Sequence, residues 1–198
     1  MAVTPSTKLD AASKALLLDT AAEAIESGLA GAASKPPELA STPPALRENG
    51  ACFVTLNIGG ELRGCVGSVE AHRPLIFDVW HNAQAAAFSD PRFMPLRAEE
   101  WPGTDLEISV LSPMRPVPAE REEDLISLLR PGQDGLVLAF GVQRATFLPK
   151  VWEQIPDARQ FVRRLKQKAG LPADFWRSTA RAWLYDTESF SRTAVSRR

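Results

Sequence analysis

The stretch "ACFVTLNIGGELRGCVGS", residues 51–68, has the pattern of a β-hairpin. β-Branched and aromatic residues flank Gly59-Gly60, and glycines adopt the positive φ angles that a two-residue hairpin turn requires. This turn predicts a register in which Val54 pairs with Cys65, with Cys52 as a diagonal neighbour on the same face. Such neighbours lie about 7–8 Å apart, at or beyond the reach of a disulfide, so we expect two free thiols.

The segments on either side of the hairpin indicate two helices and a connection. Residues 9–29 have apolar residues at helical spacing and form an amphipathic helix that ends at glycines. Residues 31–48 contain two Pro-Pro pairs, which predicts an extended surface connection or, alternatively, an interaction arm. Residues 72–89 predict a helix with Pro74 in its first turn, which ends before Pro91 because proline disfavours a helical residue in front of it.

The rest of the chain contains further short elements. We expect a strand at 105–112, a short helix at 120–130, strands at 135–141 and 144–149, a basic helix at 157–170 and a last strand at 181–190. Because helices and strands do not alternate regularly, the fold class is α+β, a mostly antiparallel sheet with flanking helices. We expect residues 1–198 to form a single domain, with an α+β core over 51–190.

Composition restricts the classes of partner. Lys and Arg number 23 against 24 Asp and Glu, giving a net charge of -1, so no global field attracts a polyanion or an anionic membrane. No apolar run approaches the roughly 20 residues of a membrane span, and the start of the sequence has no signal-peptide pattern. These features predict a cytoplasmic protein without a membrane partner.

The predicted second strand of the hairpin places a thiol close to a charged group. Residues two apart share a face of a strand, so Arg63 and Cys65 point the same way, and a guanidinium beside a thiol favours the reactive thiolate. Gly64 and Gly67 lack Cβ atoms, so a ligand can approach the backbone and an anion can accept from its N–H groups. The structural alternative is a packed cysteine, glycines at a bulge and an ion pair of Arg63 with Glu61.

A cysteine nucleophile normally needs a base, and His72 and His81 are the two histidines of the chain. His72 follows the hairpin, and His81 lies one helical turn from Asp78, which could orient it. The structural alternative for His72 is an exposed loop residue, and that for His81 is a residue on the helix face that is hydrogen-bonded to Asp78. The spacing of these residues matches no compact metal-binding motif, so we predict neither a metal nor another cofactor.

Two further features carry charge. Turn formation accounts for Asp90 and Pro91 but not for Arg92, which can reach an anion or the cysteine site. The predicted helix at 157–170 has a basic face without interleaved aromatic residues, which is typical of a solvated surface and only weakly suggests RNA. The face consists of Arg159, Arg163, Arg164, Lys166 and Lys168.

Six ordered motifs resemble the AMMECR domain family. They are "ELRGCVGS", "NAQAAAFSDPRFMPL", "LEISVLSP", "LRPGQDGLVL", "FLPKVWEQ" and "FVRRLKQKAGLPADFW". The family's hallmark is Leu-Arg-Gly-Cys-Ile-Gly, in which Val66 here replaces isoleucine. The resemblance runs from about residue 16 to residue 190 and implies two subdomains that share a cleft lined by the hexapeptide. It transfers site roles to Leu62, Arg63, Gly64, Cys65 and Gly67, and more loosely to Asp90, Pro91, Arg92 and Phe93.

The resemblance implies partners more clearly than a reaction. Prokaryotic relatives resemble protein A of the AmmeMemoRadiSam system, found beside a Memo-like protein and a radical-SAM protein. We therefore expect a small-molecule or anion site at residues 62–67, in an accessory enzyme with Cys65 as its reactive thiol. The alternatives are a non-catalytic interaction or regulatory subunit and, favoured only by the charge stripe, an RNA-binding protein.

Overall fold

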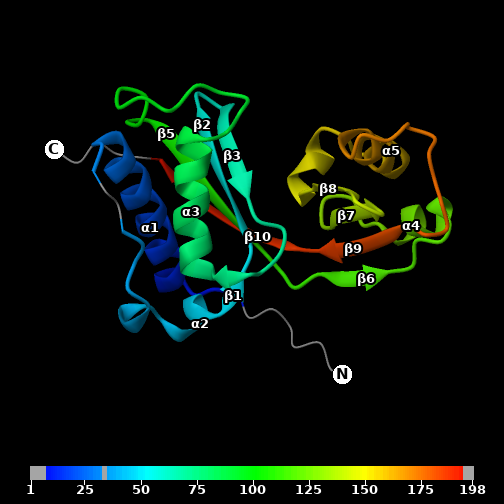
Figure 1. Cartoon of the computed structure of the whole chain (residues 1–198), viewed down its shortest axis with the longest axis horizontal. Helices are drawn as coiled ribbons and strands as arrows, with labels where there is room; N and C mark the ends of the chain where they lie inside the picture. Colours follow the sequence, from blue (N-terminus) through cyan, green and yellow to red (C-terminus); the bar gives the residue numbers. More distant parts are fainter. Residues whose placement is uncertain (1–7, 33–34, 194–198) are drawn as a thin grey trace. The chain divides into compact units, whose positions relative to one another are not determined.

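The computed structural model describes residues 8–32 and 35–193, and the chain divides into two compact units (Figure 1). Unit 1 contains the described residues up to Leu111 and from Glu188 onward, and unit 2 contains Ser112–Thr187. Each unit has its own four-stranded sheet and its own apolar core. The predicted α+β class is confirmed, because helices flank two four-stranded sheets that are largely antiparallel.

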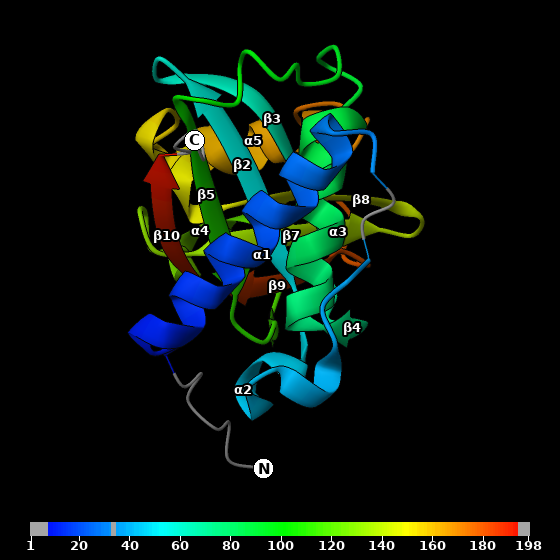
Figure 2. The same ribbon diagram turned by 90° about the vertical axis from the view of Figure 1, so that its left-hand side faces the viewer.

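Unit 1 contains the predicted hairpin in a sheet of order β10-β5-β2-β3. Two long helices lie across one face of this sheet (Figure 2). The strands are β2 (Cys52–Ile58), β3 (Glu61–Gly67), β5 (Thr104–Leu111) and β10 (Thr187–Thr193), and the helices are α1 (Ala11–Leu29) and α3 (Leu75–Phe88). A small two-stranded sheet pairs β1 (Asn49–Gly50) with β4 (Arg73–Pro74).

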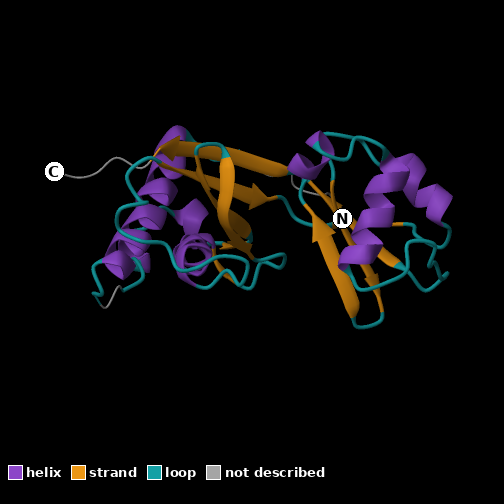
Figure 3. Cartoon of the chain, turned by 90° about the horizontal axis from the view of Figure 1, so that it is seen from above, coloured by secondary structure: helices purple, strands orange, loops and turns teal. Residues whose placement is uncertain are grey.

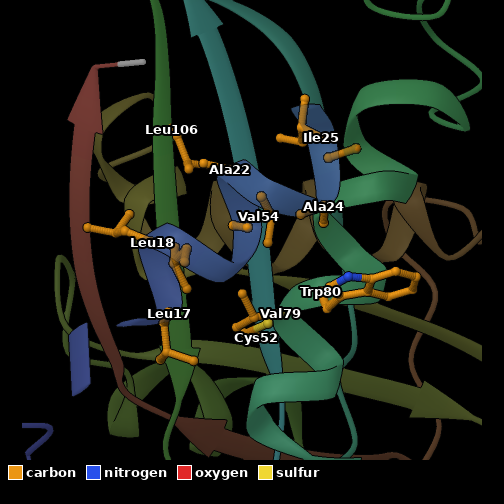
Figure 4. Close-up of a cluster of buried hydrophobic side chains, with 14 of the residues drawn as sticks. Leu17, Leu18, Ala22, Ala24, Ile25, Cys52, Val54, Val79, Trp80 and Leu106 are labelled. Carbon is orange, nitrogen blue, oxygen red and sulfur yellow. The ribbon is translucent and has the colours of Figure 1, made fainter. Parts of the chain in front are cut away.

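The core of unit 1 lies between these helices and the sheet (Figure 4). Leu17 and Ile25 of α1, Val79 of α3 and Val54 of β2 are fully buried there, together with Cys52. Full burial of such a side chain stabilises the fold by about 1.5–3 kcal/mol. The alternation of β2 thus sends Cys52, Val54 and Leu56 toward the helices and leaves the intervening residues on the opposite face.

The first helix and the Pro-rich connection are both ordered in the described part of the chain. Asp10 caps α1, because its carboxylate accepts from the backbone N–H of Ser13 at 2.7 Å. The connection is not simply extended: it contains a 3-10 helix, η1 (Leu39–Ser41), and a single helical turn, α2 (Pro44–Arg47). Pro44 suits the first position of that turn, where its missing N–H costs nothing, and the turn buries Leu46 completely.

The predicted hairpin register is wrong by one residue at Cys65. Gly59 and Gly60 form the turn with φ angles of 60° and 85°, and Ile58 pairs with Glu61 as expected. A bulge then leaves Arg63 without an opposite residue, so Leu56 pairs with Gly64 and Thr55, not Val54, pairs with Cys65. Cys65 therefore lies on the face of Thr55, opposite the face of Cys52. Both thiols are free, as predicted.

Unit 2 contains the remaining elements, in a sheet of order β6-β9-β7-β8. Its strands are β6 (Arg115–Val117), β7 (Gly135–Phe140), β8 (Gln143–Phe147) and β9 (Arg181–Tyr185). Its helices are α4 (Glu122–Leu128), the 3-10 helix η2 (Pro149–Glu153) and α5 (Ala158–Lys168). The strand predicted at 181–190 is thus two strands, and β10 belongs to the sheet of unit 1.

The basic helix α5 is only partly a solvated surface. Phe161, Val162 and Leu165 are buried in the core of unit 2. Lys166 is also buried, and its ammonium donates to both oxygens of Glu122 in α4, at 2.8 and 3.0 Å. Part of the predicted charge stripe is therefore neutralised within the unit. Among the described residues, no helix is both long and apolar enough to cross a membrane.

Candidate functional site

The thiol of Cys65 lies half-buried on the face of the unit 1 sheet opposite α1 and α3. The hydroxyl of Thr55, on the neighbouring strand β2, donates to its Sγ at 3.3 Å. In contrast, Cys52 is completely buried beneath the helices, and burial raises the pKa of its thiol well above the ordinary value. Only one of the two cysteines therefore reaches a surface.

The Asp90–Arg92 turn holds the backbone of Cys65 on both sides. Strand β3 is the edge of its sheet, and the N–H of Cys65 donates to Oδ2 of Asp90 at 2.9 Å. The carbonyl of Cys65 accepts from Nη2 of Arg92 at 3.2 Å. The two side chains thus satisfy the groups that a further strand would otherwise bind, which fixes this peptide and protects the edge.

Asp90 and Arg92 also form an ion pair with each other. Two guanidinium nitrogens of Arg92, Nε and Nη2, contact the Asp90 carboxylate at 3.0 and 2.7 Å. The hydrogen bond that Asp90 accepts from Arg92 holds the pKa of its carboxyl well below the usual range despite its burial. The hydrogen bond from the N–H of Cys65 lowers this pKa further, with a smaller effect. The hydrogen bond between Arg92 and Asp90 also raises the pKa of Arg92, and the nearby thiol of Cys65 contributes in the same direction.

Arg63 is held by a carboxylate other than the predicted one. It donates to Oε1 and Oε2 of Glu100, at 3.0 and 3.1 Å, rather than pairing with Glu61, and it also donates to the carbonyl of Pro95. This bidentate contact lowers the pKa of Glu100 to about 2. The guanidinium that contacts the peptide of Cys65 is therefore that of Arg92, and Arg63 anchors the loop after α3.

The two glycines of the motif allow close packing within unit 1. A Cβ at Gly64 would overlap the carbonyl oxygen of Ala86 in α3, so this glycine lets the helix lie directly on the strand. A Cβ at Gly67 would overlap the Phe53 ring and the carbonyl oxygen of Cys52. Leu62, which the motif also assigns to the site, is 41% exposed.

The histidines are exposed and make hydrogen bonds to backbone oxygens. Nδ1 of His72 lies 2.9 Å from the carbonyl oxygen of Glu70, and Nδ1 of His81 lies 2.9 Å from that of Phe77. The carboxylate of Asp78 points into unit 1 and does not orient His81. In the part of the chain that the structure describes, neither imidazole ring is hydrogen-bonded to Cys65.

A second polar cluster surrounds Asp78, which is completely buried at the start of α3. Its carboxylate accepts from Arg73 at 2.8 Å, from Ser68 at 2.7 Å and from Asn82 at 3.0 Å. It also accepts from the N–H of Cys52 at 2.9 Å. These contacts tie α3 to β2 and to Ser68, directly after β3, which is a different role for Asp78 from the predicted orientation of His81.

Within the described ranges, the structure contains no group of three or more His, Cys, Asp or Glu side chains that could hold a metal ion. Cys65, Thr55 and Arg92 bring a thiol, a hydroxyl and a guanidinium together around a thiol that is not fully buried. We refer to these three residues and Asp90 as the Cys65 cluster.

Comparison with known proteins places the chain among relatives of similar length. It is 39% identical over 150 residues to a protein of Methanothermobacter thermautotrophicus, covering 75% of this chain and 78% of that one. It is 36% identical over 155 residues to protein MJ0810 of Methanocaldococcus jannaschii, covering 77% and 76%. The crystal structure of the uncharacterized protein PH0010 from Pyrococcus horikoshii matches with a TM-score of 0.86 and 32% identity, over 95% of both chains. Because the AMMECR1 family model also matches residues 18–190, the chain belongs to the AMMECR1 family.

Proposed function

We propose that the Cys65 cluster is a small-molecule or anion site in which Cys65 serves as a reactive thiol of a cytoplasmic accessory enzyme. The observation that supports this proposal is the setting of the thiol. Cys65 reaches a surface beside the hydroxyl of Thr55, and the Arg92 guanidinium is fixed by Asp90 next to its peptide. A guanidinium held at this position could donate to an anionic group of a ligand that approaches the thiol.

The roles within this site differ from those of a Cys-His pair. Asp90 would position the cysteine peptide and hold Arg92, while Thr55 would donate to the sulfur. Arg63, which the hallmark motif also points to, would act through the loop that it binds rather than on the sulfur. A base would then come from the substrate or from solvent, since Nδ1 of His72 and Nδ1 of His81 each donate to a backbone carbonyl oxygen elsewhere.

Complementation of a deletion strain tests the reactive thiol, under a condition in which the gene is needed. We expect Cys65→Ser to fail although the variant protein folds and accumulates. Cys52→Ala, which removes the buried thiol, is the matched control. We expect this variant to complement the deletion provided that the protein folds and accumulates. Full complementation by Cys65→Ser would rule out the nucleophile.

The second candidate function is a non-catalytic subunit that docks a Memo-like or radical-SAM protein. Two exposed apolar residues close to the site in the sequence favour it: Leu62, three residues before Cys65, is 41% exposed, and Met94, two residues after Arg92, is 80% exposed. Large apolar side chains at a surface are typical of protein interfaces when they lie together.

Co-purification of the tagged protein with such a partner from its own cells tests the docking function. We expect Met94→Asp or Leu62→Asp to abolish recovery, because a charge would be buried at the interface. Val142→Asp is the matched control, since Val142 is 100% exposed and belongs to unit 2. Recovery that is unchanged by Met94→Asp and Leu62→Asp would contradict this candidate surface.

A further inference from the structure

The guanidinium of Arg92 and the thiol of Cys65 are brought together by contacts that all lie within unit 1. The helices of this unit lie on one side of its strands (Figure 3), and Cys65 is turned to the other side, beside Thr55. Nη2 of Arg92 donates to the carbonyl oxygen of Cys65 at 3.2 Å. The positive charge and the sulfur therefore flank the same residue.

Arg92 keeps one nitrogen for a ligand. Its Nε and Nη2 donate to the two carboxylate oxygens of Asp90, at 3.0 and 2.7 Å, and Nη2 also donates to the peptide of Cys65. Among the described residues, Nη1 has no hydrogen-bond acceptor. Because Nη1 and Nη2 share the outer edge of the guanidinium, and Nη2 uses that edge for the Cys65 carbonyl, an anion at Nη1 lies beside Cys65.

Arg92 is held in this position before a ligand binds. Asp90 binds it through both oxygens, and the guanidinium carbon lies 5.4 Å from the centre of the Phe93 ring. Asp90 is buried and also accepts from the N–H of Cys65, so the arginine and the cysteine share one anchor. A ligand does not have to order the Arg92 side chain, which lowers the entropic cost of binding.

The side chains next to Arg92 form a row with unlike ends. Cys65 of β3 pairs with Thr55 of β2, and Thr55 pairs with Glu107 of β5. Directly opposite residues of antiparallel strands share a face, so a thiol, a hydroxyl and a carboxylate follow one another from the edge strand inward. The carboxylate of Glu107 repels an anion from its end of the row, whereas Arg92 attracts one. An anionic molecule at Cys65 is therefore oriented with its charge toward Arg92.

We propose that the Cys65 cluster selects short carboxylates whose electrophilic carbon is bonded directly to the carboxylate, as in an α-keto acid. This inference rests on the proposed reactive thiol and adds the class of its substrate. The carboxylate accepts from Nη1 of Arg92, and the carbon next to it meets the sulfur, because Arg92 already contacts the peptide of Cys65. A guanidinium that is already paired with Asp90 suits a singly charged carboxylate better than a doubly charged phosphate.

Addition of the thiol to an α-keto acid needs no further reactant. The sulfur of Cys65 forms a bond to the ketone carbon, the π bond of the carbonyl breaks, and the thiol proton passes through solvent to the carbonyl oxygen. No group leaves and there is no net oxidation, so the product is a hemithioketal. The hydroxyl of Thr55, which donates to the sulfur at 3.3 Å, lies where it can donate to that oxygen instead.

Alkylation of Cys65 by two matched reagents tests the selection. Iodoacetate and iodoacetamide place the same electrophilic carbon beside a carboxylate or a neutral amide, and in both reactions the sulfur displaces iodide. We expect the ratio of the iodoacetate rate to the iodoacetamide rate to be at least about tenfold higher in the native full chain than in the unfolded chain at low salt. Mass spectrometry identifies the modified cysteine.

The two ways in which this experiment can fail are distinct. Equal rate ratios in the native and the unfolded chain, with Cys65 alkylated in both, would overturn the carboxylate selection and leave the reactive thiol standing. A Cys65 that neither reagent modifies until the protein unfolds would overturn both proposals.

Arg92→Gln should lower the native rate ratio at least about fivefold, because glutamine offers the carboxylate no charge. Arg97→Gln is the matched control, since Arg97 is an exposed arginine of the same loop that pairs with Glu100. We expect this control to leave the ratio unchanged. Equal losses in both variants would mean that the general positive charge of the loop attracts iodoacetate, against the proposal.

Protection of the wild-type protein keeps the proposal testable if Arg92→Gln does not fold. Pyruvate and hydroxyacetone present similar ketones, but only pyruvate carries a carboxylate. We expect pyruvate to halve the rate at which iodoacetamide alkylates Cys65 at a concentration at least about fivefold lower than hydroxyacetone does. Equal protection by the two ketones would contradict the selection. Inorganic phosphate that protects as well as pyruvate would identify a general anion site and also overturn the proposal.

Discussion

The carboxylate of Asp90 accepts a hydrogen bond from the N–H of Cys65 at 2.9 Å and binds the guanidinium of Arg92 through both oxygens. This one side chain links the turn after α3 to the edge strand that carries the thiol. The Asp-Pro-Arg-Phe turn and the Leu-Arg-Gly-Cys-Val-Gly strand, which are separate motifs in the sequence, therefore form one structural cluster.

Replacing Asp90 with alanine should destabilise unit 1 by about 1–3 kcal/mol, because the N–H of Cys65 and the half-exposed Arg92 both lose their acceptor. Urea unfolding of the variant measures this loss. Glu99→Ala, at an exposed position in the same loop, should change the free energy of unfolding by less than about 0.5 kcal/mol. Equal stabilities of the two variants would show that Asp90 does not hold the strand.

Gly64→Ala should destabilise the fold by at least about 1–3 kcal/mol, since a Cβ would collide with the backbone of α3 at Ala86. Gly59→Asn is the control: its φ of 60° suits asparagine and the space around it is open. Thermal unfolding should separate the two variants clearly. A Gly64→Ala protein as stable as the wild type would mean that this glycine is kept for ligand access rather than for packing.

The pair of Arg63 and Glu100 predicts a pH dependence of stability. Because the contact lowers the pKa of Glu100 from 4.5 to about 2, its contribution is fully present above about pH 4.5 and is lost as the pH falls toward 2. The free energy of unfolding of the wild type should therefore exceed that of Glu100→Gln at pH 7 and approach it in acid. A difference that stays constant from pH 7 to pH 2.5 would contradict the assignment, and Glu99→Gln should show no such change.

Much of the fold follows from local sequence signals. Gly59-Gly60 indicates the hairpin turn, Asp10 and Asp157 cap the helices that follow them, and Pro91 ends α3. These signals act over a few residues, so they can be interpreted from the sequence alone. The division into two compact units depends on long-range pairing of β9 and β10 with different sheets, which no short window contains.

The sequence pointed to Cys65, Asp90 and Arg92 of the Cys65 cluster, but not to Thr55 or to the contacts among these residues. The bulge at Arg63 turns Cys65 to the other face, and periodicity of two cannot reveal one inserted residue. The partner of Arg63 is Glu100 rather than Glu61, because the loop after α3 folds back onto β3. Asp78 had a signal, namely a polar pair with Asn82 one turn apart on an otherwise apolar stripe, which is typical of a buried hydrogen-bond network.

The central claim is that the fold presents Cys65 as a reactive thiol while it buries Cys52. The most direct measurement is the rate at which iodoacetamide alkylates each cysteine of the native protein, mapped by mass spectrometry with the unfolded protein as reference. We expect Cys65 to react at least about 100-fold faster than Cys52, which corresponds to a local opening free energy of about 2.7 kcal/mol for the buried thiol. If Cys65 reacts only after unfolding, it is a packing residue and the proposed thiol chemistry is wrong.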